Sequence, residues 1–249
     1  MKKLAIILFV FVTMSGCETA QQVLNSLPDA AGTNGLSSAQ IAAGLKEALT
    51  VGTQNSTSQL SAVDGFFKNA AIKILMPPEA EKVVSTLKTI GLNSLVDKAV
   101  LSINRAAEDA SKSATPIFVN AIKQMTITDA IGILKGGNNA ATNYFKSKTT
   151  ADLTATFSPI VNKALQQTSA TKYWNDIFTA YNQFTKNKVE TDLSSYVTGK
   201  AIDGIFYEVA IEEQKIRQNP AARVTDLLKK VFGSSLANSG NTNTGTIRQ

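Results

Sequence analysis

The densest group of polar side chains that could do chemistry lies in the segment YEVAIEEQKIRQNP, towards the C-terminal end of the chain. Glu208 and Glu212 are four residues apart, so a helix places their carboxylates on one face. Paired carboxylates of this kind could bind a divalent cation or act as acid and base in glycoside cleavage. Glu213 and Arg217 share the same spacing and could form an ion pair. The favoured interpretation is a solvated helix face, or an Arg217 that braces a second helix through buried hydrogen bonds.

A second polar cluster lies in the segment NRAAEDA, where Arg105 and Glu108 are three residues apart. The alanines between and after them are small, so a neighbouring helix can approach closely enough to offer Arg105 a carboxylate. Asp64 and Asp203, in the similar phrases AVDGFF and AIDGIF, are the expected partners. A simple ion pair within the helix is favoured over such a contact, and either arrangement gives the cluster an architectural role.

Two further features could bind a ligand. The glycine-containing stretch KGGNN (135–139) lacks the Walker spacing, the Lys-Ser/Thr pair and the preceding strand of a phosphate-binding loop, so a turn between helices is favoured. An aromatic stripe at helical spacing could stack on sugars or line a lipid pocket, although such a stripe is more often part of a core. The stripe consists of Tyr173, Trp174, Phe178, Tyr181 and Phe184.

Composition excludes much of the remaining chemistry. The chain has no histidine and one cysteine, Cys17, which leaves no Ser-His-Asp or Cys-His catalysis, no imidazole metal site and no disulfide. The net charge of +6 is mild and spread along the chain, with no basic cluster that favours nucleic acid. We therefore expect a protein that is not an enzyme, holds no cofactor or metal, and binds no nucleic acid.

The residues around Cys17 are typical of a bacterial lipoprotein signal peptide. A basic head, Lys2–Lys3, precedes nine apolar residues, Leu4–Val12, a run far shorter than the about 20 residues that span a bilayer. Small residues, Ser15–Gly16, then precede the cysteine, and this order resembles the lipobox, in which the cysteine is acylated and becomes the first mature residue. We predict lipidation of Cys17, with palmitate among its acyl chains. An ordinary signal peptide with an incidental cysteine, or a buried N-terminal helix, is the alternative.

Helical spacing of apolar residues dominates the rest of the chain. Ile41, Leu45 and Leu49 share one face of a helix for which Ser37 or Ser38 is a natural N-cap. No alternating β-branched stretch competes, so we predict an all-α, single globular domain of about nine to eleven helices. The predicted parts are a signal peptide (1–16), a flexible lipid-anchored tether (17–36), the helical domain (37–233) and a disordered polar tail (234–249).

The pattern also predicts particular helix boundaries. One helix begins near Asp64 and stops before Pro77, and the next ends at Gly91. Thr128 is the expected N-cap of a further helix. The final boundaries are a kink or division at Pro159, a break at Asn219–Pro220, and a last helix ending at Gly233.

Two parts of the chain resemble each other around these boundaries. AVDGFF and AIDGIF are each expected to precede a helix, a proline and a second helix that ends in glycine. The interval from Pro78 to Gly91 equals the interval from Pro220 to Gly233. This internal similarity could mark two related helical hairpins, or it could be a coincidence among short apolar helices.

Six phrases between about Leu36 and Gly233 carry a resemblance to a known family. In order along the chain they are DGFFKNAAIKILMP, NRAAEDAS, MTITDAIGILKGG, ATNYFKSKTTADL, AIDGIFYEVAIEEQKIRQNP and LLKKVFG. Together they resemble a bacterial lipoprotein family catalogued as domain of unknown function 4197. The resemblance implies a secreted, lipid-anchored, mostly helical domain with no established activity, and it transfers no catalytic residue to this chain.

The sequence therefore favours a protein of the bacterial cell envelope, anchored through lipid at Cys17 to a membrane, with the outer membrane preferred, and facing the periplasm or the cell surface. A non-enzymatic interaction or structural module is the main hypothesis, with an envelope protein or peptidoglycan as a further partner. A helical module that binds a small apolar ligand or lipid is the alternative, and a carboxylate-based hydrolase ranks third.

Overall fold

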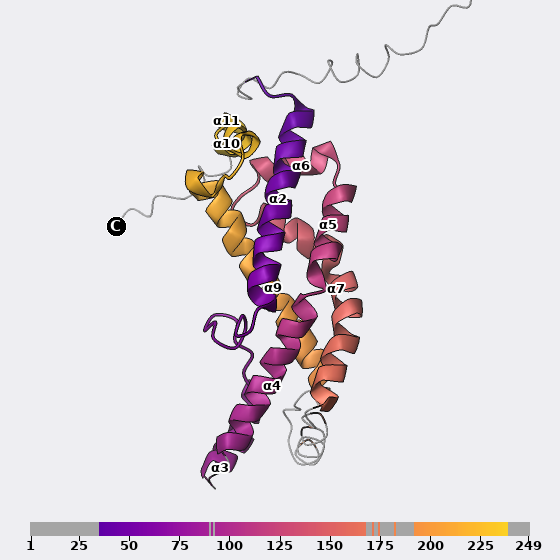
Figure 1. Ribbon diagram of the computed structural model, residues 1–249, viewed down its shortest axis with the longest axis vertical. Helices are drawn as coiled ribbons and strands as arrows, with labels where there is room; N and C mark the ends of the chain where they lie inside the picture. The colour runs from indigo at the N-terminus through magenta and orange to yellow at the C-terminus, as the bar shows by residue number, and fades with distance from the viewer. Residues whose placement is uncertain are drawn as a thin grey trace, which may run out of the picture. The chain divides into compact units, whose positions relative to one another are not determined.

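The computed structural model describes residues 35–89, 91, 93–167, 171, 174, 182 and 192–238 (Figure 1). Every regular element in these ranges is helical, which confirms the all-α prediction. The nine α-helices defined there are α2 (Ser38–Ser61), α3 (Glu81–Thr89), α4 (Asn93–Ser111), α5 (Ala114–Gln124), α6 (Ile127–Lys135), α7 (Ala140–Gln167), α9 (Leu193–Gln218), α10 (Asp226–Phe232) and α11 (Ser235–Asn238). Two short 3₁₀ helices are η1 (Pro78–Ala80) and η2 (Pro220–Ala222).

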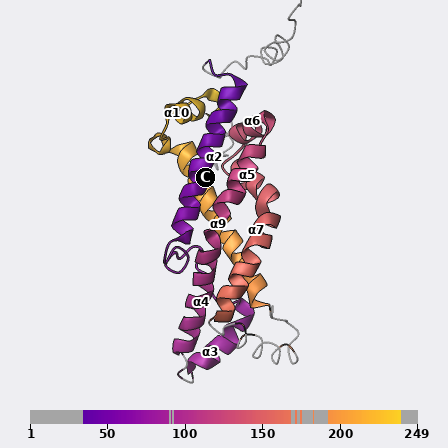
Figure 2. The ribbon, with the colours of Figure 1, turned by 45° about the vertical axis from the view of Figure 1, so that its right-hand side comes forward.

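Helix α9 packs against three other long helices, α2, α4 and α7, and α5 and α6 pack against α2 and α7 (Figures 1 and 2). Rings from three of these helices meet in the core. Phe118 of α5 lies edge-on to Phe145 of α7 at 5.2 Å and to Phe206 of α9 at 6.2 Å, measured between ring centroids. All three rings are buried, so this aromatic contact joins the helices that flank the candidate site described below.

Helix N-termini follow local capping chemistry. Ser37 caps α2, and its hydroxyl and the Gln40 side chain form a reciprocal capping box. The expectation that Thr128 caps α6 is wrong, because Thr126 does so. The Thr126 hydroxyl accepts from the amide of Asp129, whose carboxylate accepts from the amide of Thr126. Three residues after Thr128 stands Ile131, which has no side-chain acceptor to complete such a box.

The helix predicted from Asp64 to the residue before Pro77 is not formed. Residues 62–76, here called the clamped loop, contain no α-helix. Asp64 has φ of +72°, in the left-handed region that helix interiors exclude. Side chains of α4, among them Asn104 and Glu108, take up backbone groups that a helix would pair internally. Tertiary hydrogen bonds therefore override the helical pattern of this stretch.

The hypothesis of two related hairpins is wrong in its first half, because AVDGFF lies in the clamped loop whereas AIDGIF lies inside α9. The second halves of the two proposed hairpins do agree locally, since Pro78 and Pro220 each begin a 3₁₀ helix that leads towards a short α-helix. The predicted break at Asn219–Pro220 separates α9 from η2. Pro159, by contrast, lies inside an undivided α7.

The described chain extends a little beyond both predicted domain ends. Leu36, the last residue of the predicted tether, is buried against the core, and α11 follows Gly233 within the predicted tail. The signal peptide, Cys17 and most of the tether lie outside the described residues, as does most of the aromatic stripe. Of that stripe Trp174 is described, and its side chain is buried.

The described residues include several long helices. No single helix there is long and apolar enough to cross a bilayer, whereas α5 and α6, bent by 106° at their junction, satisfy length and composition only as a pair. Many of the apolar side chains of this pair, including Phe118, Ile122 and Leu134, are buried in the core.

Gly204 of α9 gives the first testable prediction, because it accommodates the fully buried ring of Phe66 from the clamped loop. A Cβ at Gly204 would lie 2.5 Å from Phe66 Cε1. Gly204→Ala should therefore lower the free energy of unfolding by about 1–3 kcal/mol. Urea denaturation followed by circular dichroism measures the change.

Gly199→Ala is the matched control on the same helix. A Cβ there has nothing within 4 Å, so this substitution should raise stability by about 0.5–1 kcal/mol through its gain in helix propensity. Equal effects of the two substitutions would contradict the proposed contact.

Candidate functional site

Glu213 of α9 binds the first turn of α7. Its carboxylate accepts hydrogen bonds from the backbone amides of Ala141 at 3.0 Å and Thr142 at 2.9 Å, and from the Thr142 hydroxyl at 2.9 Å. It also pairs with Arg217, whose Nη2 lies 2.9 Å from Glu213 Oε1. The Glu213 side chain is only 5% exposed, so both oxygens are fully engaged within the protein.

Arg217 binds the last turn of α6, on the other side of the same junction. Its guanidinium donates to the carbonyl of Ile133 at 2.7 Å and, at 3.3 and 3.4 Å, to the carbonyls of Leu134 and Gly136. Its side chain is 9% exposed. The ion pair of Glu213 and Arg217 therefore bridges two chain ends rather than lying free on the helix surface.

The charges of this pair match the helix ends that they meet. The N-terminus of a helix presents unpaired amides and a partial positive charge, and the C-terminus presents unpaired carbonyls and a partial negative charge. Glu213 meets an N-terminus and Arg217 meets a C-terminus. The stretch KGGNN (135–139) contains the last residue of α6 and the turn that leads to α7, and α9 holds this turn from both sides.

Arg105 of α4 lies close to one of its two expected partners. Its Nη2 donates to Asp64 Oδ1 at 2.7 Å across 41 residues of sequence, and its Nη1 donates to Glu108 within the helix. Asp203 lies elsewhere on α9, exposed, with Lys200 at 4.0 Å. The long-range pair and the intrahelical pair thus occur together, and the expectation that Asp203 also reaches Arg105 is wrong.

Two neighbours on α4 bind the backbone of the clamped loop. Glu108 is buried, and its Oε1 accepts from the consecutive amides of Phe66 and Phe67, both at 3.1 Å. Asn104, also buried, accepts from the amide of Ile74 at 2.9 Å and donates to the carbonyl of the same residue at 2.8 Å. The loop is therefore fixed to α4 at both its start and its end.

Electrostatics support the same assignment. Hydrogen bonds from Lys68 and then Arg105 hold the pKa of Asp64 below its ordinary value. Hydrogen bonds to Asp64 and then Glu108 raise the pKa of Arg105. Each partner thus stabilises the charged form of the other, which suits a permanent ion pair.

Glu208 and Glu212, the pair that suggested catalysis, have separate partners. Glu208 is buried and accepts from Asn69 Nδ2 of the clamped loop at 2.8 Å. Glu212 pairs with Lys215 and accepts from Asn55 Nδ2 of α2 at 3.4 Å. Over the described part of the chain, no three His, Cys, Asp or Glu residues lie together in a group that could hold a metal ion.

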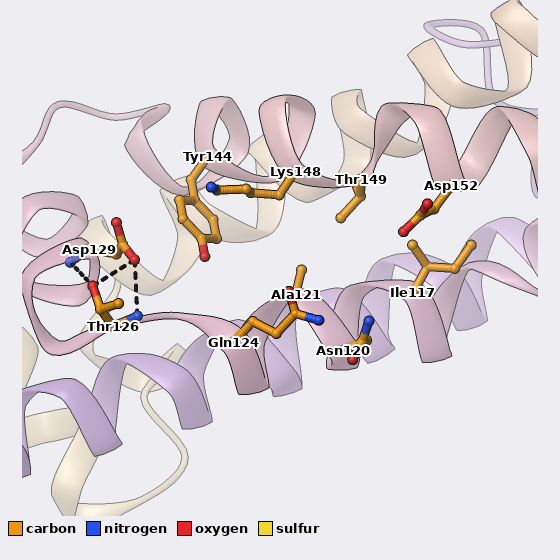
Figure 3. Close-up of a pocket in the computed structure, with 10 residues that line it drawn as sticks. All are labelled: Ile117, Asn120, Ala121, Gln124, Thr126, Asp129, Tyr144, Lys148, Thr149 and Asp152. Carbon is orange, nitrogen blue, oxygen red and sulfur yellow. Dashed lines mark hydrogen bonds between the residues drawn. The ribbon is translucent and has the colours of Figure 1, made fainter.

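A pocket of about 220 Å³ lies between α5 and α7, next to the turn that begins α6 (Figure 3). Sequence reasoning did not single it out. Polar groups recur at intervals of four residues on both helices, which is a signal that could have indicated it, but only if α5 and α7 were known to face each other. The lining residues are Ile117, Asn120, Ala121, Gln124, Thr126, Asp129, Tyr144, Lys148, Thr149 and Asp152.

Tyr144 and Asp129 set the electrostatics at one end of the pocket. Burial, and then the charge of Asp129, raise the pKa of Tyr144, so its hydroxyl stays protonated. Hydrogen bonds from the Thr126 side chain and backbone lower the pKa of Asp129. Lys148 Nζ lies 5.9 Å from the centroid of the Tyr144 ring. The pocket therefore combines the hydroxyl donor of Tyr144 and the side chain of Lys148 with the carboxyl groups of Asp129 and Asp152.

Comparison with known proteins gives one match. The model of a family described as protein of unknown function (DUF4197) matches residues 35–233, which is nearly the whole helical domain. Neither a curated protein nor a solved structure matches the chain.

Arg217→Leu tests whether the pair on α9 supports the α6–α7 junction. The substitution leaves Glu213 charged and buried without its cation, and removes the donors to three carbonyls. Breaking a buried pair in this way should lower the free energy of unfolding by about 3–5 kcal/mol, measured by urea denaturation.

Lys229→Ala is the control, since Lys229 pairs with Asp226 at 3.2 Å where both side chains are exposed. It should change stability by no more than about 0.5 kcal/mol. Similar small effects of both substitutions would show that the buried pair does not hold the junction.

Proposed function

The chain belongs to the DUF4197 family, a family of unknown function, and from this premise we propose that it is a lipid-anchored protein of the bacterial cell envelope whose helical domain acts as a non-enzymatic interaction or structural module. The anchor is lipid on Cys17, and the preferred location is the outer membrane. An envelope protein or peptidoglycan is the partner that this location makes available.

The anchoring part of the proposal rests on the N-terminal sequence. This segment has the order that lipoprotein processing requires. It runs from two lysines through nine apolar residues and two small residues to the chain's single cysteine. Each methylene of an acyl chain on Cys17 would contribute roughly 0.8 kcal/mol when buried in the membrane. Two or three acyl chains are enough for stable attachment.

The non-enzymatic part rests on one observation, which is that the clustered carboxylates serve the backbone. Glu108 and Glu213 each accept hydrogen bonds from two consecutive amides and from an arginine. A carboxylate fully engaged in this way has no free position for substrate. Glu208 and Glu212 have different partners, which disfavours the hydrolase alternative that needs them to converge.

A binding module for a small ligand remains a second candidate, supported by the pocket between α5 and α7. The lining of this pocket is mainly polar. It favours a polar ligand over the apolar ligand or lipid that the sequence suggested.

Cys17→Ala tests the anchor. Cells that express the full chain are grown with labelled palmitate, and the purified protein is analysed for label and for the mass of its N-terminal peptide. The unsubstituted protein should carry label and begin at an acylated Cys17, whereas Cys17→Ala should carry none. Ser26→Ala, within the predicted tether, is the control and should be labelled normally. Equal labelling of the Cys17→Ala protein would overturn the lipid anchor.

Glu208→Gln separates a structural carboxylate from a catalytic one. Loss of the charge that receives Asn69 should lower the free energy of unfolding by about 1 kcal/mol. Catalytic groups are often held at a cost to stability, so their replacement tends to stabilise the protein. Asp109→Asn, at an exposed pair with Lys112, is the control and should have little effect. A clear gain in stability for Glu208→Gln would favour the hydrolase.

A further inference from the structure

We propose that the pocket between α5 and α7 binds an uncharged, hydroxyl-rich group of the size of one sugar ring, as presented by a saccharide. This inference deepens the second candidate function, the module for a small polar ligand, on which it rests, and it does not depend on the lipid anchor. It rests on the side chains that line the pocket, on their unused hydrogen-bonding groups, and on the size of the space between them.

The facing helices present two rows of hydrogen-bonding groups. Asn120 and Gln124 are four residues apart on α5, and Tyr144, Lys148 and Asp152 follow at the same interval on α7 (Figure 3). Within the described residues, none of these five side chains makes a hydrogen bond or ion pair. Lys148 and Asp152 have suitable spacing for a pair, yet they remain apart. This differs from the polar clusters of α4 and α9, whose hydrogen-bonding groups are occupied.

The mixture of groups favours a neutral ligand. Asp129 and Asp152 disfavour an anion, and Lys148 disfavours a cation. The two amides each offer a donor and an acceptor in one plane, and the Tyr144 hydroxyl adds a donor. A sugar hydroxyl is likewise both donor and acceptor, so adjacent hydroxyl groups can pair with amides and carboxylates without any net charge.

The apolar part of the lining matches the other half of a sugar's chemistry. Ile117 and Ala121 belong to the wall formed by α5, and the ring of Tyr144 adds apolar surface at the end of the pocket nearest Asp129 (Figure 3). One face of a pyranose ring carries mainly C–H groups, which pack against such surfaces. A small inorganic ion would leave this surface unused.

The size of the pocket limits the ligand to about one ring. Its volume of about 220 Å³ is smaller than the roughly 300–1,000 Å³ of sites for drug-sized molecules. A ligand with few atoms and partial burial binds weakly, so we expect millimolar affinity for a free monosaccharide. A glycan polymer offers many copies of the same unit and would be retained more strongly through multivalent binding.

Saturation-transfer NMR of the full chain in a detergent without a sugar headgroup tests the proposal. N-acetylglucosamine and glucose are the probes, and choline and glutamate are the charged comparisons. At least one sugar should show saturable transfer, and neither charged compound should bind more tightly. Asn120→Ala combined with Gln124→Ala should weaken sugar binding at least tenfold, and Tyr144→Phe a few-fold. Gln54→Ala, an exposed glutamine on α2, is the matched control and should leave binding unchanged.

Several outcomes would overturn the proposal. These are no saturable transfer to either sugar, equal binding by the double variant, and tighter binding of choline or glutamate. Tyr144→Phe keeps the aromatic ring, so it remains informative if the double variant unfolds. Retention of the chain on insoluble chitin, with release by free sugar, would identify a polymer as the source of the ligand. Binding of the free sugar without retention would identify a soluble source.

Discussion

The buried ion pair of Glu213 and Arg217 is the interaction on which the arrangement of α6, α7 and α9 depends. A buried pair by itself is weak evidence for stability, because desolvation offsets much of the attraction between its charges. Here each charge also forms hydrogen bonds with backbone groups at a helix end. Those groups need partners in any case, so these hydrogen bonds offset part of the desolvation of the pair. Tyr144, one turn into α7, and Asp129, in the first turn of α6, are thereby held on the same side of the pocket.

The clamped loop uses the same chemistry a second time. Glu108, like Glu213, accepts from two consecutive amides and from an arginine on its own helix. In both places a charged side chain on a long helix satisfies the backbone where the chain changes direction. The acidic and basic residues are dense in sequence because each such place needs both signs close together. This density is what made these segments resemble catalytic clusters.

Apolar spacing and capping residues predict most of the fold, because these are local properties of a helix. Ser37 and the break at Asn219–Pro220 show this directly. The clamped loop could not be predicted, because its backbone partners belong to α4, distant in sequence. AVDGFF and AIDGIF differ in structure for a related reason. Gly65 lies in a turn where a Cβ would be 2.4 Å from the carbonyl oxygen of Gln59, whereas Gly204 makes room in a helix for the ring of Phe66.

The protonation states in the pocket favour recognition over proton transfer. An efficient general acid or base has a pKa close to the working pH. The environment moves both shifted pKa values further from neutral pH. Burial raises the pKa of Tyr144, and hydrogen bonds from Thr126 lower the pKa of Asp129. At neutral pH Tyr144 therefore keeps its proton and Asp129 keeps its charge. Fixed donors and acceptors of this kind suit a site that holds a ligand by hydrogen bonds and leaves its covalent structure unchanged.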